Sequence, residues 1–296
     1  MESIRLARLS RLLEEAPIKT ALALVALAAF IVVGLTVLDR AGFVSFDFIA
    51  ANWTFLVGPA ELALFATIVS YVIGFGFAIP MGAARAFGPG ILKRRDTSAW
   101  IFAPIYGFVS GYAEAVRGTP VYVQILLVHG LVTAAVPKLS AVSLWAGIIA
   151  LTINTAGYQT EVFRAGFQSV GQGQLEAAKS IGMRKFQAFR YITFPQALRL
   201  ITLPLVNEWI ALFKASSLLS AISVLELMWG AQYIGVNLGH PIDGFLMVSF
   251  YYLVILIPLS RVVSYIERKK RIPGLGTAEP ARTRFIGFRR TAPQDL

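Results

Sequence analysis

The chain has 296 residues, 56% of them hydrophobic, and a mean hydropathy of +0.67. A soluble domain is only about 45–50% apolar even with glycine counted, so this composition excludes an ordinary soluble protein and indicates an integral membrane protein. The formal charge of +11 does not indicate a nucleic-acid partner, because the basic residues lie between apolar segments and not together on one soluble face.

Several chemistries are excluded by what the sequence lacks. It has no cysteine and two widely separated histidines, His129 and His240. This excludes disulfides, thiolate metal sites and a cysteine nucleophile, and the histidine spacing argues against a transition metal. No G-x-x-x-x-G-K-[ST] sequence occurs, so the chain has no P-loop for nucleotide phosphates. We expect no cofactor bound by this chain itself.

The first predicted element is an apolar run over residues 20–38, close to the roughly 20 residues that a membrane-crossing helix needs. A basic leader, residues 1–19, precedes it. A cleaved signal peptide is the alternative interpretation, since a basic segment also precedes its apolar core. We favour a retained transmembrane helix, because the run is long and no A-x-A cleavage sequence ends it before Asp39.

An external loop, residues 39–57, follows, with a short amphipathic helix expected at residues 46–55. The second span is predicted over residues 59–82. It contains Gly74, Gly76 and Gly82, small residues that let neighbouring helices approach closely. A basic cytoplasmic loop is expected next, with Arg85, Lys93, Arg94 and Arg95.

Residues 99–136 are too long for one ordinary span and are divided by an Arg-Gly-Thr-Pro sequence at 117–120. Because an arginine is costly at mid-bilayer, we place Arg117 at the cytoplasmic border. A structural pair with Glu114 is favoured for it over cargo contact. Residues 118–136 then cross the membrane at about 1.5 Å per residue. Residues 100–116 lie near the interface or enter at a slant.

Three further spans are predicted over residues 141–163, 201–228 and 244–266, with a long polar loop, residues 165–200, between the first two. Of the 27 Lys and Arg residues, 23 lie in segments that this order puts on one side. Only Arg40 and Lys138 lie in the opposite loops. The positive-inside rule therefore places both termini in the cytoplasm. The tail, residues 271–296, is predicted to be disordered.

Polar side chains within the spans are candidates for a translocation path, because they are costly to bury in an apolar helix. Asn154, Tyr158 and Glu161 share one face at i, i+4, i+7 spacing. This face either lines an aqueous path or makes helix–helix hydrogen bonds. Gln124, two turns beyond Arg117, is expected to face the same interior.

A second group of polar residues lies in the 201–228 span. Asn207 and Lys214 share a face, while Glu208 lies about 100° round the helix. Lys214 with Ser216 and Ser217 is the best candidate for a cargo or gate element, and the mixture of ammonium, amide and carboxylate groups suits a zwitterionic cargo.

Charged groups outside these two sets have simpler interpretations. Glu226 and Asp243, near the outer ends of their spans, are expected to be solvated charges or contacts for a binding protein. His129 is expected to be a packing or interfacial residue.

The long polar loop contains a short run of helix-forming residues, Glu176, Ala177 and Ala178, followed by Gly182. The alanines leave a smooth surface, Glu176 offers an ion-pairing group, and Gly182 can end the turn at little steric cost. Such a knob can sit in a cleft of a soluble partner, although a solvated amphipathic loop has the same composition. Four apolar residues after it are expected to clamp the loop onto its own subunit: Phe186, Phe189, Ile192 and Phe194.

Three sequence blocks occur in order along the chain. The first, residues 114–124, contains Glu114, Arg117, Gly118, Thr119, Pro120 and Gln124; the second is residues 154–169; the third joins residues 176–182 with Pro195, Pro204, Asn207 and residues 214–218. Together they resemble the membrane permease subunit of bacterial ATP-binding-cassette (ABC) importers, in the polar amino acid branch of histidine-, glutamine- and arginine-type permeases. The chain departs from the branch at Ala215-Ser216-Ser217, where members often have a threonine before the second serine.

The resemblance implies an all-α integral membrane fold of the MetI-like, type I importer kind. A five-helix core over residues 55–270 is joined by one additional N-terminal helix, giving about six spans. It further implies that Glu176, Ala177, Ala178 and Gly182 couple the chain to a separate cytoplasmic ATPase dimer, which uses ATP and Mg. The implied partners are a second permease subunit, identical or homologous, and an extracytoplasmic amino-acid-binding protein at the bacterial inner membrane.

An ion-coupled secondary transporter or channel without an ATPase is the alternative function, because the spans and buried charges permit it. The sequence shows no evident inverted repeat, however, and the polar loop would be left without a purpose. A membrane enzyme would need a nucleophile with its base, or metal-binding carboxylates at one depth, and neither histidine has a suitable companion. We therefore expect a transport subunit and not an enzyme.

Overall fold

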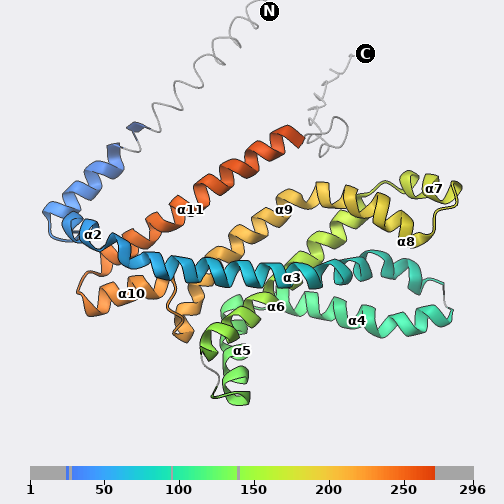
Figure 1. Cartoon of the computed structure of the whole chain (residues 1–296), viewed down its shortest axis with the longest axis horizontal. Coiled ribbons are helices and arrows are strands. Elements are labelled where there is room, and N and C mark those ends of the chain that lie inside the picture. The colour runs from blue at the N-terminus through green and yellow to red at the C-terminus, as the bar shows by residue number, and fades with distance from the viewer. Residues whose placement is uncertain (1–24, 27–28, 95, 139–140, 271–296) are drawn as a thin grey trace, which may run out of the picture.

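The computed structural model describes residues 25–26, 29–94, 96–138 and 141–270, and its regular elements there are all helices (Figure 1). In chain order these are α2 (Phe46–Asn52), η1 (Trp53–Leu56), α3 (Val57–Leu92), α4 (Thr97–Gly118), α5 (Val121–Ala135), α6 (Val142–Ser169), α7 (Gln172–Ser180), α8 (Lys185–Ala188), η2 (Phe189–Thr193), α9 (Phe194–Ala215), η3 (Ser216–Ile222), α10 (Leu227–Asn237) and α11 (Pro241–Lys270). Residues 29–40 are also helical. The predicted leader, the start of the predicted first span and the predicted tail lie outside the described residues.

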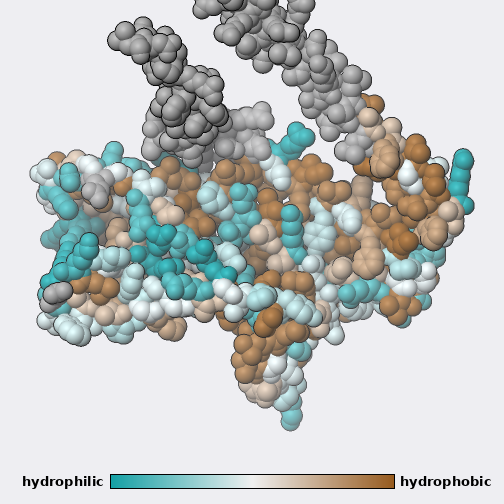
Figure 2. All heavy atoms as spheres, turned by 180° about the vertical axis from the view of Figure 1, so that it is seen from behind, coloured by the Kyte–Doolittle hydropathy of each residue, from teal (hydrophilic) through white to brown (hydrophobic). Residues whose placement is uncertain are grey.

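The predicted all-α membrane fold is confirmed. Among the described residues, three stretches are long and apolar enough to cross a membrane: 46–92, 185–222 and 241–263. Helices α4 and α5 together would make a fourth crossing, broken by a bend of 112°. Helix α3 alone has 36 residues, about 54 Å of helix, so it extends well beyond a hydrocarbon core of about 30 Å. Hydrophilic residues gather at the end of the molecule that carries α7 and α8 (Figures 1 and 2).

Helix α6 is at the centre of the packing and contacts α3, α4, α5 and α9. Its contact with α3 depends on two of the predicted small residues. A Cβ atom added at Gly74 would lie 2.5 Å from Thr155 Cγ2, and one added at Gly82 would lie 2.5 Å from Phe163 Cβ. These glycines therefore let the two backbones approach closely, whereas Gly76 faces open space.

Hydrogen bonds between helices fix the core at several depths. The Ser70 hydroxyl donates to the Ile148 carbonyl at 3.1 Å, which joins α3 to α6. Tyr71 donates to the Leu205 carbonyl at 2.8 Å and joins α3 to α9. Tyr112 donates to the Ile153 carbonyl at 2.6 Å and joins α4 to α6. Buried hydroxyls need partners of this kind because the apolar interior offers no water.

Two predicted boundaries are wrong. Helix α3 continues to Leu92, so Arg85 lies within a helix and not in a basic loop. Residues 118–136 do not form one unaided span, because α5 has 15 residues and covers only about 22 Å.

The other ends of the predicted elements are closer to the structure. The short helix predicted at residues 46–55 is present as α2 followed by η1. The helix begun by α9 ends at Ile222, six residues before the predicted end, where Ser223 adopts a φ of +62°. A second short helix, α10, then begins after Glu226.

Candidate coupling surface and translocation path

The predicted knob is the short helix α7, at the polar end of the molecule (Figure 1). Glu176 and Ala177 are exposed on it, while Ala178 is only 1% exposed and packs inward. The helix therefore presents an acidic group and a small side chain outward while one alanine holds it to the subunit. The smooth outer surface is narrower than the sequence predicted, because only one of the two alanines contributes to it.

Gly182 ends this helix in the way its position predicts. Its φ is +77°, a left-handed conformation that costs glycine little. The Gly182 amide donates to the Lys179 carbonyl and the Met183 amide donates to the Ala178 carbonyl, both at 3.0 Å. These two bonds are the pair that closes a Schellman C-cap, so they fix the direction in which the chain leaves α7.

The predicted aromatic clamp is only partly present. Phe189 and Phe194 pack against the buried cluster that contains Phe163 and Phe167. Phe186 does not, and its assignment to the clamp is wrong: it is 76% exposed. Ile181 is 77% exposed as well. Ile181, just after α7, and Phe186, within α8, thus display two large apolar side chains at the polar end of the molecule.

The Arg-Gly-Thr-Pro sequence forms the break between α4 and α5. Gly118 is the last residue of α4, Thr119 follows in an extended conformation, and Pro120 caps α5. The Gln124 side-chain nitrogen lies 2.8 Å from the Val116 carbonyl and 2.8 Å from the Thr119 hydroxyl. It therefore satisfies backbone and side-chain acceptors that the bend leaves open.

Gln124 also connects this break to the central helix. Its carbonyl oxygen accepts from the Asn154 amide at 3.0 Å. Asn154, Tyr158 and Glu161 are partly exposed, while their neighbours Thr155, Gln159 and Thr160 are buried. The structure thus places the three on one accessible stripe of α6 and joins the first of them to Gln124.

Glu161, at the polar end of that stripe, is surrounded by arginines. Arg85 Nη1 lies 3.0 Å from Glu161 Oε2, and Arg164 Nε lies 2.9 Å from both carboxylate oxygens. Arg117 Nη1 lies 3.8 Å away. Three cations from α3, α4 and α6 therefore converge on one carboxylate, which ties the polar ends of these helices together.

The predicted Arg117–Glu114 pair is not formed. Arg117 extends to Glu161, and Glu114, with its side chain 73% exposed, instead accepts from Arg85 at 3.5 Å. The reason is that Arg85 continues on helix α3 beside α4 and reaches Glu114 itself. Arg85 and Arg164 were missed from the sequence, although the i, i+3 spacing of Glu161 and Arg164 was a readable signal.

Helix α9 exposes the face that the sequence predicted. Pro204, Asn207, Ala211 and Lys214 are all exposed, while Leu205, Leu212 and Phe213 are buried. Pro195 occupies the first turn of the helix, where its missing amide is not needed. Asn207 and Lys214 therefore share one open side of a helix that begins at the coupling loop.

The two serines after Lys214 are separated by the structure. Ser216 is fully buried and its hydroxyl donates to the Phe213 carbonyl at 2.8 Å. Ser217 donates to the Lys214 carbonyl at 2.7 Å and lines an open groove with Lys214.

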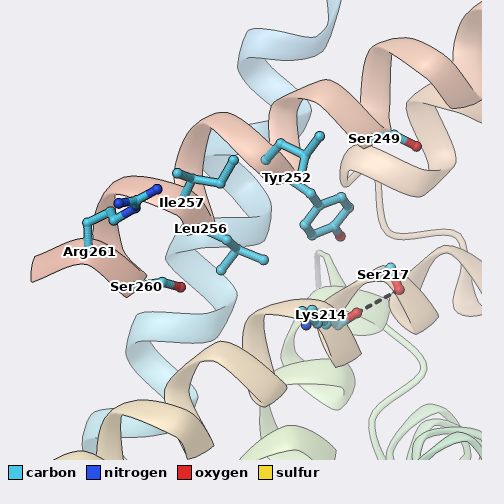
Figure 3. A pocket seen from close by; sticks show the side chains of 9 residues that line it. Lys214, Ser217, Ser249, Tyr252, Leu256, Ile257, Ser260 and Arg261 are labelled. Atoms are coloured by element: carbon cyan, nitrogen blue, oxygen red, sulfur yellow. Dashed lines mark hydrogen bonds between the residues drawn. The ribbon is translucent and has the colours of Figure 1, made fainter. Parts of the chain in front are cut away.

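This groove lies between α9 and α11 and has a volume of about 760 Å³. Figure 3 shows Tyr252 and Leu256 of α11 facing Ser217 and Lys214, with Arg261 further along α11. The other lining residues are Ser249, Leu253, Ile257 and Ser260. The α11 side of the groove was not predicted, because only the three-dimensional structure brings these residues opposite Lys214.

At the opposite end, two acids that were expected to be solvated are buried, so that interpretation is wrong. Glu226 is fully buried and caps α10, accepting from the amides of Met228 and Trp229 at 3.0 Å each. Burial raises the pKa of its carboxyl to about 7, although those two hydrogen bonds oppose the rise. Asp243 is 2% exposed and accepts from the Ser45 amide and from His240. Both acids satisfy amides at helix ends, which solvent would otherwise have to do.

His129 lies at the contact between α5 and α6. His129 Nε2 lies 3.2 Å from the Ser143 hydroxyl, which joins α5 to α6. Among the described residues, no three His, Cys, Asp or Glu side chains gather in a way that would hold a metal ion.

A helical membrane subunit with a broken span, a central helix and a short helical loop at its polar end has the architecture of a transport permease. Residues 97–272 match the family model described as "Binding-protein-dependent transport system inner membrane component". The chain therefore belongs to this family of ABC transporter permease subunits, and it is a multi-pass membrane protein.

Individual relatives agree with this assignment. The chain is 33% identical over 212 residues to the probable glutamine ABC transporter permease protein GlnM of Bacillus subtilis, covering 70% of this chain and 95% of the relative. It is 33% identical to the nopaline transport system permease protein NocM of Agrobacterium fabrum, covering 71% and 84%. A solved structure titled "Crystal structure of an amino acid ABC transporter with histidines" matches with a TM-score of 0.64 and 30% identity, over 76% of this chain and 99% of that one.

The fold also matches a more distant transporter. An inward-facing MetNI methionine ABC transporter structure aligns with a TM-score of 0.56 at 22% identity, over 71% of this chain. At this identity the match supports the fold alone, and it confirms the predicted MetI-like architecture.

Proposed function

We propose that this chain is the permease subunit of an ATP-driven importer and forms the translocation path for a polar amino acid. An extracytoplasmic binding protein delivers the cargo, and a second permease subunit completes the path. The family match supports the permease role, and the printed names of relatives such as the glutamine permease GlnM support an amino acid as cargo. We also propose that both termini lie in the cytoplasm, because 23 of the 27 Lys and Arg residues lie in segments on that side of the predicted spans.

The observation that carries the proposal is helix α7, a rigidly capped knob that exposes Glu176 and Ala177 at the polar end of the molecule. We propose that it inserts into a cleft of a cytoplasmic ATPase dimer that uses ATP and Mg. The exposed apolar side chains of Ile181 and Phe186 beside it would be buried by such a partner, which adds binding free energy. Ala178 and Gly182 hold the knob in shape from within.

Motion at the knob reaches the path through α9. This helix starts two short elements after α7 and runs without a break to Lys214. Pro195 and Pro204 set the angle at which α9 enters the membrane and its direction within it. A rigid helix transmits displacement along its length. On this proposal Asn207, Lys214 and Ser217 face the path, whereas buried Ser216 shapes the helix end.

The stripe on α6 forms the other proposed wall. Gln124, Asn154 and Tyr158 are available to polar groups of the cargo, and Glu161 closes the inner end through its arginines. Five residues have a structural role, because they form the break between α4 and α5 and its ionic contacts: Glu114, Arg117, Gly118, Thr119 and Pro120.

The test is reversal of the charge on the knob. Glu176→Lys in the reconstituted importer should leave membrane insertion and complex purification intact but reduce cargo uptake at least tenfold. Glu176→Gln keeps the size of the side chain and removes only its charge, so uptake should be intermediate. Normal uptake by the Lys variant would refute the coupling role. An ATPase that copurifies and is stimulated by loaded binding protein would exclude the ion-coupled alternative.

A further inference from the structure

Glu208 of α9 is an acid that the structure leaves without a partner of opposite charge. It is partly buried in an apolar helix. Among the described residues, no basic side chain lies within ion-pair distance of its carboxylate. A carboxylate in a membrane-spanning helix is costly without a partner, and such groups mark functional sites. Glu208 is therefore a candidate for an ion pair that forms in another state of the protein.

Arg117, in the last turn of α4, is the cation that acts on Glu208. The two groups interact electrostatically, although they are too far apart for an ion pair. Glu208 follows Leu205 by three residues, so the two are neighbours on the surface of α9, and the Leu205 carbonyl accepts from Tyr71 of α3. Arg117 itself reaches Glu161 of α6. It thus lies between one acid that it contacts and a second that it does not.

Of the three arginines around Glu161, Arg117 is held least firmly. Its Nη1 atom is 3.8 Å from Glu161 Oε2. Arg85 Nη1 is 3.0 Å from that oxygen, and Arg164 Nε is 2.9 Å from both carboxylate oxygens. The Arg117 side chain is also 42% exposed, against 12% for Arg85. Arg117 can therefore leave Glu161 without leaving that carboxylate unpaired.

The helices on both sides of this contact are placed to move. Directly after Arg117 comes the bend of 112° between α4 and α5, where Gly118 has open space around it. Helix α9 runs from the end of the molecule that carries α7 and α8 toward its middle (Figure 1). Shifts of about 1–2 Å are common when a helix changes between two states. Such a shift of α9 would change the distance between Glu208 and Arg117.

Resting on the proposed function, we propose that Arg117 is a positioning residue for transport that exchanges its partner. In the resting importer it pairs with Glu161, and it pairs with Glu208 when the ATPase displaces α9. Glu161 keeps two arginines after the exchange, whereas Glu208 gains the partner that it lacks, so the exchange stabilises the displaced position of α9. Because Arg117 adjoins the α4–α5 bend, the exchange links the motion of α9 to the inner end of the proposed path.

The test measures ATP-dependent uptake of a radiolabelled mixture of the common L-amino acids by the reconstituted importer. Glu208→Gln removes the second partner and should reduce uptake roughly tenfold. The Tm of this variant should stay unchanged, because the pair is absent from the resting state. Arg117→Glu should also reduce uptake. The double variant Arg117→Glu with Glu208→Arg reverses both charges and should restore most of the lost uptake.

The matched control places the reversed charge one turn away on the same helix. Arg117→Glu with Glu114→Arg also exchanges two opposite charges, but both lie on α4, so uptake should stay low. A structural role for Glu208 would instead lower the Tm of Glu208→Gln. A contact of Glu208 with the cargo would not be restored by moving its negative charge to position 117.

The two partners of Arg117 should affect ATP hydrolysis in opposite directions. Glu161→Gln frees Arg117 for Glu208 and should raise hydrolysis severalfold in the absence of binding protein, since it shifts the population toward the displaced state. Glu208→Gln should lower severalfold the stimulation that loaded binding protein produces.

Normal uptake by Glu208→Gln, failure of the double variant Arg117→Glu with Glu208→Arg to restore uptake, or changes of the same sign in both hydrolysis measurements would overturn the proposal. The unsubstituted importer is the reference throughout. If it takes up no amino acid with ATP, the permease function itself fails. If it imports normally and only the variants behave otherwise than expected, the partner exchange fails and the permease assignment stays intact.

Discussion

Replacement of Arg85 tests whether the arginines around Glu161 hold the polar ends of the helices together. The Arg85 side chain is 12% exposed and contacts Glu161 at 3.0 Å and Glu114 at 3.5 Å. Breaking a buried ion pair costs about 3–5 kcal/mol when the remaining charge is left alone. Here Glu161 keeps Arg164 and Arg117, and Glu114 is exposed, so the loss should approach that of one charged hydrogen bond, about 2 kcal/mol.

The assay is thermal unfolding of the purified chain in one detergent. About 2 kcal/mol should lower the Tm of Arg85→Gln by roughly 3 °C, because the unfolding entropy of a chain of 296 residues is about 0.6 kcal/mol/K. Arg199→Gln, at an exposed position, is the matched control and should change the Tm little. In a double-mutant cycle, Arg85→Gln and Glu161→Gln together should cost less than the sum of the two, by about 0.5–3 kcal/mol. Strict additivity would show that the two side chains do not act as a unit.

Three further predictions follow from other parts of the structure. Gly182→Ala places a side chain on a residue with a φ of +77° and should destabilise the coupling loop by about 1 kcal/mol. The loss is measured as faster amide hydrogen exchange over α7. The control Gly171→Ala, at a φ of −58° with open space around it, should leave the exchange rate unchanged. The pKa of Glu226 rises from 4.5 to about 7 on folding, so the protonated carboxyl favours the folded state. About 3 kcal/mol of stability should therefore be lost as the pH rises from about 4.5 to 7. A Glu226→Gln variant whose stability keeps the same dependence on pH would contradict this. Finally, an impermeant thiol reagent applied to intact cells should label Lys138→Cys and not Lys185→Cys, and the reverse pattern would overturn the proposed topology.

Sequence reasoning found the elements whose signal is local. The apolar runs located the spans, the helix-forming residues before Gly182 located α7, and i, i+4, i+7 spacing placed Asn154, Tyr158 and Glu161 on one stripe. Each of these depends on helical period or on glycine conformation, which the sequence states directly.

The failures concern contacts between distant segments. Arg85 lies within helix α3 and not in the predicted loop, because three arginines and two carboxylates compensate one another where α3 extends beyond the bilayer thickness. Glu226 and Asp243 are buried although acids seldom are, because amides at helix ends donate to them, and a sequence does not show such partners. Tyr252 and Arg261 come opposite Lys214 only when α11 packs beside α9.

Reconstitution into proteoliposomes measures most directly whether the chain is the permease of an ATP-driven importer. The chain, its copurifying ATPase and a binding protein loaded with radiolabelled amino acid are combined, with ATP inside the vesicles and no ion gradient. We predict uptake that requires ATP, the binding protein and an intact Glu176 together. Uptake that proceeds without ATP and follows an imposed proton or sodium gradient would contradict the proposed function and favour a secondary transporter.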